Sequence, residues 1–239
     1  MSTDMTTGTT ITLITGATKG LGRETARRLV AAGHDVYVGA RDAERGAAVA
    51  RDLGCRSVQL DVLDAGSVAA AVETIGQERG TLDVLVNNAG VPGGSLAAVD
   101  TTAEEVERVY ATNVLGVVRV THAFLPLLLR SPAPTVVNVS SGLGSFAVTT
   151  DTSLPWSAWK GLAYPSSKAA LNMLTSQYAK NFPQLRINAV DPGYTATDLN
   201  GHRGEQSVEE GAEVIVAMAM IGKDGPTGGF FDRDGTVPW

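Results

Sequence analysis

Residues 15–22 read Thr15-Gly16-Ala17-Thr18-Lys19-Gly20-Leu21-Gly22, and they join a short β-branched run to an amphipathic helical pattern. The run before them, 10–15, predicts a strand, and the pattern after them, 21–32, predicts a helix. Glycines at such a junction permit a tight turn and let the backbone approach a pyrophosphate, which the helix N-terminus stabilises. The stretch therefore predicts a dinucleotide site at the first strand–helix junction of an α/β protein.

The same alternation continues along the chain. Further strands are predicted at 35–38, 57–60, 82–86, 135–139, 186–190 and 229–231, and further helices at 43–53, 67–79, 103–130 (with a break expected before Pro126), 165–181 and 208–220. This order predicts an α/β fold with a doubly wound, mostly parallel, seven-stranded sheet (a Rossmann fold). We expect a single domain over residues 10–239 and a flexible tail over residues 1–9.

Two segments interrupt the alternation. Residues 142–161 form a long connection without clear periodicity, and residues 200–207 are polar and contain glycine. Both follow the carboxyl ends of predicted strands, where ligands bind in an open α/β sheet. We expect these segments to form walls of the substrate site, and we expect 200–207 to be mobile.

Composition excludes several classes of protein. The net charge of −6 over 239 residues disfavours a nucleic-acid partner, and the single cysteine, Cys55, excludes an intrachain disulfide. The three histidines are not spaced as metal ligands, so no metal site is expected. The apolar runs are shorter than the ~20 residues of a membrane span, and the N-terminus does not resemble a secretion signal. The sequence predicts a soluble, cytoplasmic protein.

The end of the second predicted strand bears on cofactor choice. In many NAD-binding proteins an acid there holds the ribose 2′-hydroxyl, whereas this chain has Ala40 followed by Arg41. An arginine suits a 2′-phosphate, and Lys19 in the glycine loop is a second cation for the same group. These residues favour NADP(H). Alternatively both cations are solvated surface charges, and Asp42 reaches the ribose.

A tyrosine and a lysine four positions apart, Tyr164 and Lys168, begin a predicted helix with Pro165 in its first turn. Residues at this spacing share one helix face, so the ammonium can approach the phenol and lower its pKa from about 10. Such a pair alone is a common coincidence. Ser140 and Ser141, however, end the fifth predicted strand at the edge where ligands bind.

Further polar fragments follow strand ends in the same order. Asn87-Asn88-Ala89-Gly90 closes the fourth strand, and residues 191–197 follow the sixth. Together with the glycine loop and the Ser–Tyr–Lys set, they resemble the short-chain dehydrogenase/reductase family over residues 10–239. The ending, 227–231 with Pro238-Trp239, resembles the carbonyl-reductase branch of that family.

The resemblance implies a role for each matching residue. Ser141 orients the carbonyl, Tyr164 donates the proton in reduction, Lys168 tunes Tyr164 and binds the ribose, and Asn113 holds a water of the proton relay. Asp61 and Val62 would contact the adenine, and no metal takes part. The implied cofactor-binding residues are Gly16, Thr18, Lys19, Gly20, Leu21, Gly22, Arg41, Asp61, Val62, Asn88, Ala89, Gly90, Tyr164, Lys168, Pro192, Gly193, Thr195 and Thr197.

The implied activity is NADPH-dependent reduction of a ketone or aldehyde by pro-S hydride transfer. The alternatives are a biosynthetic ketoreductase acting on an acyl-carrier or polyketide intermediate, and an NADP-sensing protein on the same fold. Ser141 and Tyr164 are 23 positions apart, a longer gap than is usual in the family. In carbonyl-reductase relatives an insertion there covers the tetramer surface, which implies a monomer or homodimer acting on a small molecule, without nucleic-acid or membrane partners.

Overall fold

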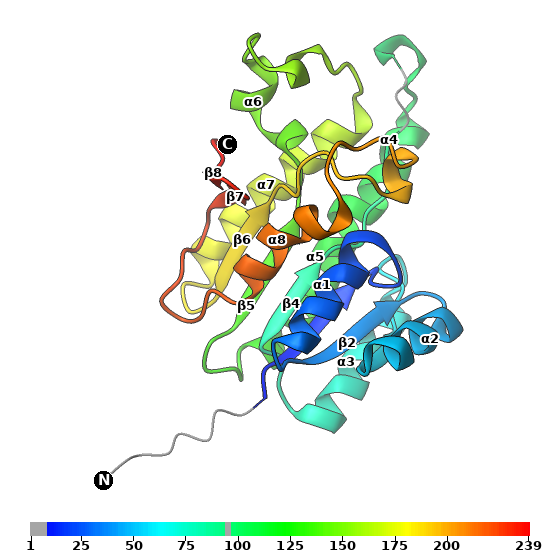
Figure 1. The fold of residues 1–239 in the computed structure, drawn as a ribbon, viewed down its shortest axis with the longest axis vertical. Coiled ribbons are helices and arrows are strands. Elements are labelled where there is room, and N and C mark those ends of the chain that lie inside the picture. Colours follow the sequence, from blue (N-terminus) through cyan, green and yellow to red (C-terminus); the bar gives the residue numbers. More distant parts are fainter. Residues whose placement is uncertain (1–8, 94–96) are drawn as a thin grey trace.

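The computed structural model describes residues 9–93 and 97–239, and its described part is built around one twisted sheet flanked by helices (Figure 1). The strand order is β3-β2-β1-β4-β5-β6-β7-β8, and every neighbouring pair except the last is parallel. The strands are β1 (Ile11–Thr15), β2 (Asp35–Ala40), β3 (Arg56–Gln59), β4 (Val84–Asn87), β5 (Thr135–Val139), β6 (Arg186–Val190), β7 (Phe230–Asp232) and β8 (Gly235–Thr236).

The seven predicted strands are confirmed, β5 and β6 with the predicted bounds and the others with ends shifted by at most two residues. The predicted number of strands was too low by one. The eighth strand, β8, pairs antiparallel with β7 through Phe231 and Thr236. It has only two residues, one of them Gly235, so it shows neither alternation nor a β-branched run. The predicted tail lies outside the described residues except for Thr9, which is exposed.

Helices cover both faces of the sheet. The α-helices are α1 (Gly20–Ala31), α2 (Ala43–Leu53), α3 (Ala65–Arg79), α4 (Ala103–Tyr110), α5 (Val117–Leu128), α6 (Phe146–Thr150), α7 (Ala163–Asn181) and α8 (Val208–Ala219). Residues of α3, α5 and α7 share one apolar cluster, and residues of α1 and α8 share another on the opposite face.

Neighbouring residues of the central strands belong to different clusters. On β4, Leu85 packs with the α3–α5 layer, whereas Val84 and Val86 pack with the α1–α8 layer. On β5, Val136 and Val137 divide between the two layers in the same way. All five side chains are at most 3% exposed, as expected for strands covered on both faces. The continuous apolar runs of the sequence follow from this packing.

The long helix predicted over 103–130 is irregular at a different place from the one expected. Pro126 lies inside α5 and does not break it, because proline in the last turn removes one backbone hydrogen bond without ending the helix. The irregularity lies instead at η2 (Ala111–Gly116), a stretch of π-helix that contains Asn113. Such wide turns recur at functional sites.

The span Ala103–Leu128 is long and apolar enough, by length and composition, to cross a membrane. In its most apolar window 61% is buried inside the fold. Phe124 and Val120 of this span are fully buried in the cluster formed with α3. Packing in the core therefore accounts for the apolar character of this helix.

Both segments that were expected to form walls of the substrate site have local structure. Residues 142–161 contain three short helical pieces, η3 (Gly142–Gly144), α6 and η4 (Pro155–Ala158), and rise above the carboxyl edge of the sheet (Figure 1). The polar segment 200–207 is tied back by a bridge between Thr195 and Gln206.

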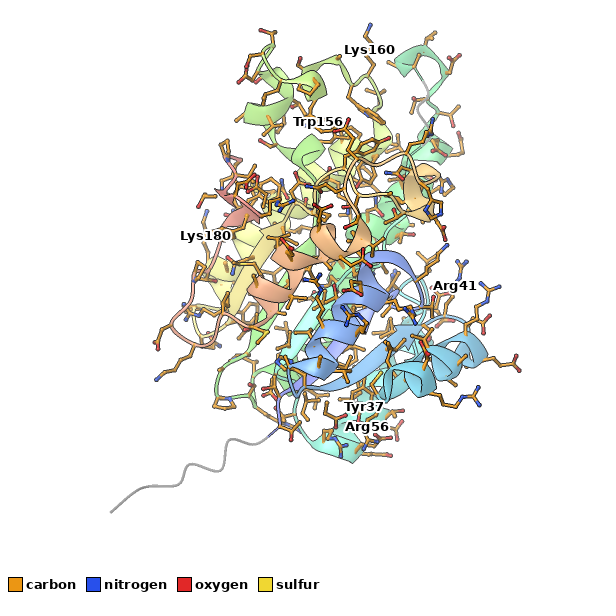
Figure 2. The ribbon with its side chains drawn as sticks, viewed as in Figure 1. Tyr37, Arg41, Arg56, Trp156, Lys160 and Lys180 are labelled. Carbon is orange, nitrogen blue, oxygen red and sulfur yellow. The ribbon has the colours of Figure 1, made fainter. Side chains whose placement is uncertain are left out.

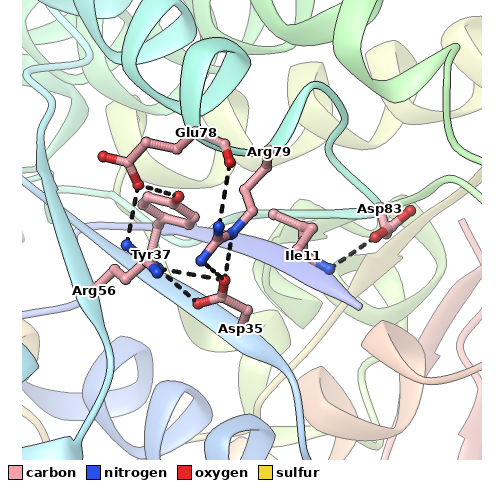
Figure 3. A network of polar contacts seen from close by, with 7 residues as sticks. All are labelled: Ile11, Asp35, Tyr37, Arg56, Glu78, Arg79 and Asp83. Carbon is pink, nitrogen blue, oxygen red and sulfur yellow. Dashed lines mark hydrogen bonds and ion pairs between the residues drawn. The ribbon is translucent and has the colours of Figure 1, made fainter. Parts of the chain in front are cut away.

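A polar network closes the opposite, amino-terminal end of β2 (Figure 3). The hydroxyl of Tyr37 donates to Glu78 at 2.6 Å, and Arg56 contacts both Glu78 and Asp35 at 3.2 and 3.1 Å. Arg79 completes the network with an ion pair to Asp35 at 2.6 Å. These contacts fasten α3 to β2 and β3 and lie away from the carboxyl edge of the sheet.

Candidate active site

The glycine loop after β1 has the geometry of a phosphate cradle. Gly16 and Gly20 adopt positive φ of 62° and 53°. A Cβ on Gly22 would collide with Nδ2 of Asn88 and lie 2.9 Å from the carbonyl oxygen of Gly16. Lys19, which precedes α1, directs its ammonium to Asp198 rather than capping the helix. The first turn of α1 therefore receives no side-chain cap from residue 19, so its N–H groups can bind an anion such as a dinucleotide pyrophosphate.

Asn88 at the end of β4 fixes this loop. Its side-chain amide donates to the carbonyl oxygens of Thr15 and Gly16 at 2.9 and 3.1 Å. Its own N–H and that of Ala89 both donate to the Thr15 hydroxyl at 3.0 Å. The Asn-Asn-Ala-Gly fragment thus holds the glycine loop from the neighbouring strand.

The remaining residues assigned to the cofactor lie along the same edge. Arg41 follows β2, Asp61 and Val62 follow β3, and residues 192–197 follow β6, so all come from carboxyl ends of parallel strands. Thr197 reaches the glycine loop, since its Cγ2 lies 3.6 Å from the Cβ position of Gly20. The structure therefore brings the predicted residues to one side of the sheet.

The two expected phosphate cations differ in their surroundings. Ala40 is buried where an acid would hold a 2′-hydroxyl, and the exposed Arg41 follows it beside α2 (Figure 2). Lys19 forms an exposed ion pair with Asp198 at 2.5 Å, so this cation already has an anionic partner. The carboxylate of Asp42 accepts the N–H groups of residues 44 and 45 as the cap of α2, which disfavours its alternative role at the ribose.

The predicted catalytic side chains meet at the start of α7. Tyr164 and Ser141, which follows β5, line the same cleft, and the Ser141 hydroxyl is near enough to the phenol to lower its pKa. The Lys168 ammonium lies 5.5 Å from the centre of the Tyr164 ring and donates to the carbonyl oxygen of Val139 at 2.8 Å. The Ser141 hydroxyl also accepts the N–H of Leu143 at 3.2 Å. Serine, tyrosine and lysine therefore form one cluster, as predicted.

The predicted pKa change of Tyr164 has the wrong sign. Burial, followed by the negative charge of Asp191, raises the pKa of Tyr164 above its ordinary value, and the nearby Ser141 hydroxyl opposes them. Burial also lowers the pKa of Lys168 to about 8, against the opposing charge of Asp191. Desolvation decides both directions because each charged form loses water at this site. Tyr164 is accordingly held as a phenol, the form that donates a proton.

Asn113 lies fully buried in the π-helical stretch. Its amide oxygen accepts the N–H of Val91 at 2.9 Å, and its amide nitrogen donates to Val91 O at 3.0 Å and to the Ser167 hydroxyl at 3.1 Å. Ser167 in turn donates to the backbone carbonyl of Tyr164 at 2.7 Å. Asn113 thus supports the tyrosine backbone, and its role in holding a water remains a prediction.

A cleft of about 370 Å³ opens beside this cluster. Ser141 and Tyr164 line it together with Trp156 from η4 and Tyr194 from the loop after β6. The two aromatic rings meet edge to face, with centroids 5.9 Å apart, and Trp156 lies above the carboxyl edge of the sheet (Figure 2). Segment 142–161 borders the cleft through Trp156 and Trp159, and segment 200–207 borders it through Asn200 and Arg203. The cleft offers room for a small, largely apolar molecule.

The sequence reasoning assigned no individual role to three contributors to this site. Asp191 lines the cleft and Ser167 supports Tyr164, while Tyr194 packs against Trp156 in the cleft wall. An acid placed between a strand end and a Pro-Gly turn was the available signal for Asp191. Nothing in the local pattern singles out Ser167.

The sequence predicts no metal site, because the three histidines are scattered along the chain. Within residues 9–93 and 97–239, no group of three or more His, Cys, Asp or Glu side chains is placed to hold a metal ion. His34 contacts the Thr12 hydroxyl at 2.8 Å, and His202 contacts Asp198 at 2.7 Å. The half-buried Cys55 is a free thiol whose pKa is raised by burial.

Comparison with known proteins identifies the family. The profile of the short chain dehydrogenase family matches residues 10–208. This chain is a short chain dehydrogenase. It is 34% identical to (-)-isopiperitenone reductase of Mentha piperita, over 93% of this chain and 96% of the relative, and 30% identical to (+)-neomenthol dehydrogenase of Capsicum annuum, over 96% and 98%.

Solved structures agree with this membership. The NADPH-bound carbonyl reductase from chicken fatty liver is similar with a TM-score of 0.85 and 25% identity, over 97% of this chain and 99% of the other. Salutaridine reductase from Papaver somniferum gives a TM-score of 0.81 at 28% identity, over 94% and 99%. The predicted family, the single α/β fold and the class of oxidoreductase are therefore confirmed for this short chain dehydrogenase.

Proposed function

We propose that this short chain dehydrogenase reduces the carbonyl of a small ketone or aldehyde to an alcohol with NADPH. The observation that carries the proposal is the meeting of Ser141, Tyr164 and Lys168 at the wall of a cleft beside the glycine loop. NADPH supplies the hydride when bound. Relatives named as reductases of isopiperitenone and salutaridine, and the NADPH-bound avian structure, support the direction and the cofactor.

The residues of this chain would act on the carbonyl oxygen. Ser141 donates a hydrogen bond that orients it, and Tyr164 gives it a proton as the carbon is reduced. Because burial and Asp191 raise the pKa of Tyr164, the phenol stays protonated at neutral pH and is ready to donate. The Lys168 ammonium beside the ring stabilises negative charge that develops on the tyrosine oxygen.

The choice of NADPH over NADH is supported by the end of β2. Arg41 is exposed where it can contact a 2′-phosphate, and Asp42 is engaged as a helix cap. A guanidinium forms paired hydrogen bonds to a phosphate, whereas a ribose hydroxyl gains little from it. Aromatic and leucine side chains in the cleft favour an apolar substrate body, which suits a cyclic or aromatic carbonyl compound.

The test is a fluorescence titration of the purified protein with NADPH and with NADH, followed by a panel of ketones and aldehydes. We expect tighter binding of NADPH and its consumption with at least one apolar carbonyl compound. Binding of NADPH without turnover of any member of a broad panel would favour the NADP-sensing alternative. Preferential binding of NADH would contradict the assignment of Arg41.

A further inference from the structure

An acidic side chain stands where two loops of the catalytic cleft meet. Asp191 directly follows β6 and lines the cleft together with Ser141 and Tyr164. Its backbone N–H donates to the carbonyl oxygen of Phe231 at 2.8 Å, which fixes the residue to the edge of the sheet. The resemblance to the family assigns no role to this carboxylate, although it lies in the catalytic cleft.

The carboxylate holds two backbone groups at once. Its Oδ1 accepts the N–H of Gly193 at 3.0 Å, in the Pro-Gly turn that follows β6. Its Oδ2 lies against the backbone of Gly142, the residue next to Ser141, and this nearby N–H lowers the pKa of Asp191. Both loops are thus joined through one side chain.

The approach to Gly142 is close. A Cβ on this residue would lie 2.7 Å from Oδ2 of Asp191, nearer than real Cβ contacts come. Gly142 is buried, so the backbone has no room to move away into solvent. The absence of a side chain at 142 is therefore what lets the carboxylate reach the backbone beside the catalytic serine.

We propose that Asp191 is a positioning residue, which clamps the Ser141 loop to the loop after β6 so that Ser141 and Tyr164 keep one geometry toward the carbonyl during proton transfer. The proposal rests on the reductase function proposed above. A misplacement of about 1 Å in a catalytic group can cost about 100-fold in rate, so a contact this near to Ser141 matters to turnover.

The negative charge of Asp191 also affects the protonation of Tyr164 and Lys168. Burial raises the pKa of Asp191, and the N–H groups of Gly193 and Gly142 oppose it. The charged groups that face the carboxylate are Asp232, which raises this pKa, and Lys168, which lowers it. Asp191 in turn raises the pKa of both Tyr164 and Lys168. Loss of its charge would lower the pKa of both groups, so the phenol and the ammonium would both lose their protons at a lower pH.

The clamp is tested first without any substrate. Asp191→Ala removes both acceptors, and Asp191→Asn keeps the size while removing the charge. Asp64→Ala is the matched control, because its carboxylate also accepts two backbone N–H groups but at the start of α3. We expect faster amide hydrogen exchange over residues 140–145 and 191–195 in Asp191→Ala, and wild-type exchange there in Asp64→Ala. Unchanged exchange over 140–145 in Asp191→Ala would overturn the proposal.

Turnover then tests the role in proton transfer. In carbonyl reduction we expect Asp191→Ala to lower kcat by about 10- to 100-fold, and Asp191→Asn to move the alkaline limb of the pH–rate profile to lower pH. A fall in kcat with the limb unmoved would show a merely structural residue and would overturn the proposal. If the wild-type protein turns over no carbonyl compound while the exchange result is as expected, the clamp stands and the proposed function fails.

Discussion

Replacement of Gly22 by alanine tests the cofactor cradle most sharply. The new Cβ would collide with Nδ2 of Asn88 and lie 2.9 Å from both the Gly16 carbonyl oxygen and the Ala17 Cα. The asparagine can move, but the backbone atoms cannot move without opening the loop. Displacing Asn88 also gives up its hydrogen bonds to Thr15 and Gly16.

The magnitude follows from these contacts. Overpacking costs about 1 to 3 kcal/mol, and two lost hydrogen bonds add about 1 kcal/mol each. A total of about 3 to 5 kcal/mol, if it falls wholly on the binding-competent loop, weakens NADPH binding by about 100-fold or more. Any part of this free-energy cost that destabilises the whole fold lowers the free energy of unfolding instead of weakening NADPH binding.

The assay is a fluorescence titration with NADPH beside urea unfolding followed by circular dichroism. Gly76→Ala is the matched control, because its Cβ would meet only Leu127 at 3.6 Å, an ordinary contact. Alanine within a helix is favoured over glycine, so this variant should bind NADPH normally and unfold at equal or higher urea. If Gly22→Ala kept both the NADPH affinity and the stability of the wild-type protein, the claim that the glycine loop needs a bare backbone at Gly22 would be refuted.

Three further outcomes follow from the same geometry. Asp198→Asn frees Lys19 from its exposed ion pair, so NADPH binding should tighten by no more than about fivefold while NADH binding stays unchanged; weaker NADPH binding would place Lys19 outside the phosphate site. Arg41→Ala should weaken NADPH far more than NADH in the same titration, and equal losses would contradict its phosphate contact. Since burial lowers the pKa of Lys168 to about 8, its ammonium is lost above that pH, and reduction should slow as pH rises; a rate that stays constant to pH 10 would contradict this role.

The order of strands and helices could be predicted because both sheet faces are covered. Alternate residues of β4 and β5 pack into different layers, and burial on both faces requires continuous apolar runs in the sequence. The π-helical turn at Asn113 could not be predicted, since its sequence carries the same amphipathic pattern as the helices around it. The two-residue strand β8 is too short to show any period.

The site residues were predictable where chemistry coincides with a strand end or a helix face. Ser141 follows β5, and Tyr164 and Lys168 share one face of α7. The direction of the Tyr164 pKa was not predictable, because it depends on burial and on Asp191, which only the folded chain brings near. The ion pair of Lys19 with a residue 179 positions away is equally invisible in the sequence.

The protonation step is the central claim, and Tyr164→Phe tests it most directly. The wild-type and variant proteins are titrated with NADPH, and the consumption of NADPH is then followed with the same apolar ketones and aldehydes. We predict that both bind NADPH within about twofold of each other, while loss of the proton donor slows turnover by about 100-fold or more. Wild-type kcat in Tyr164→Phe would contradict the assignment of Tyr164 as the proton donor.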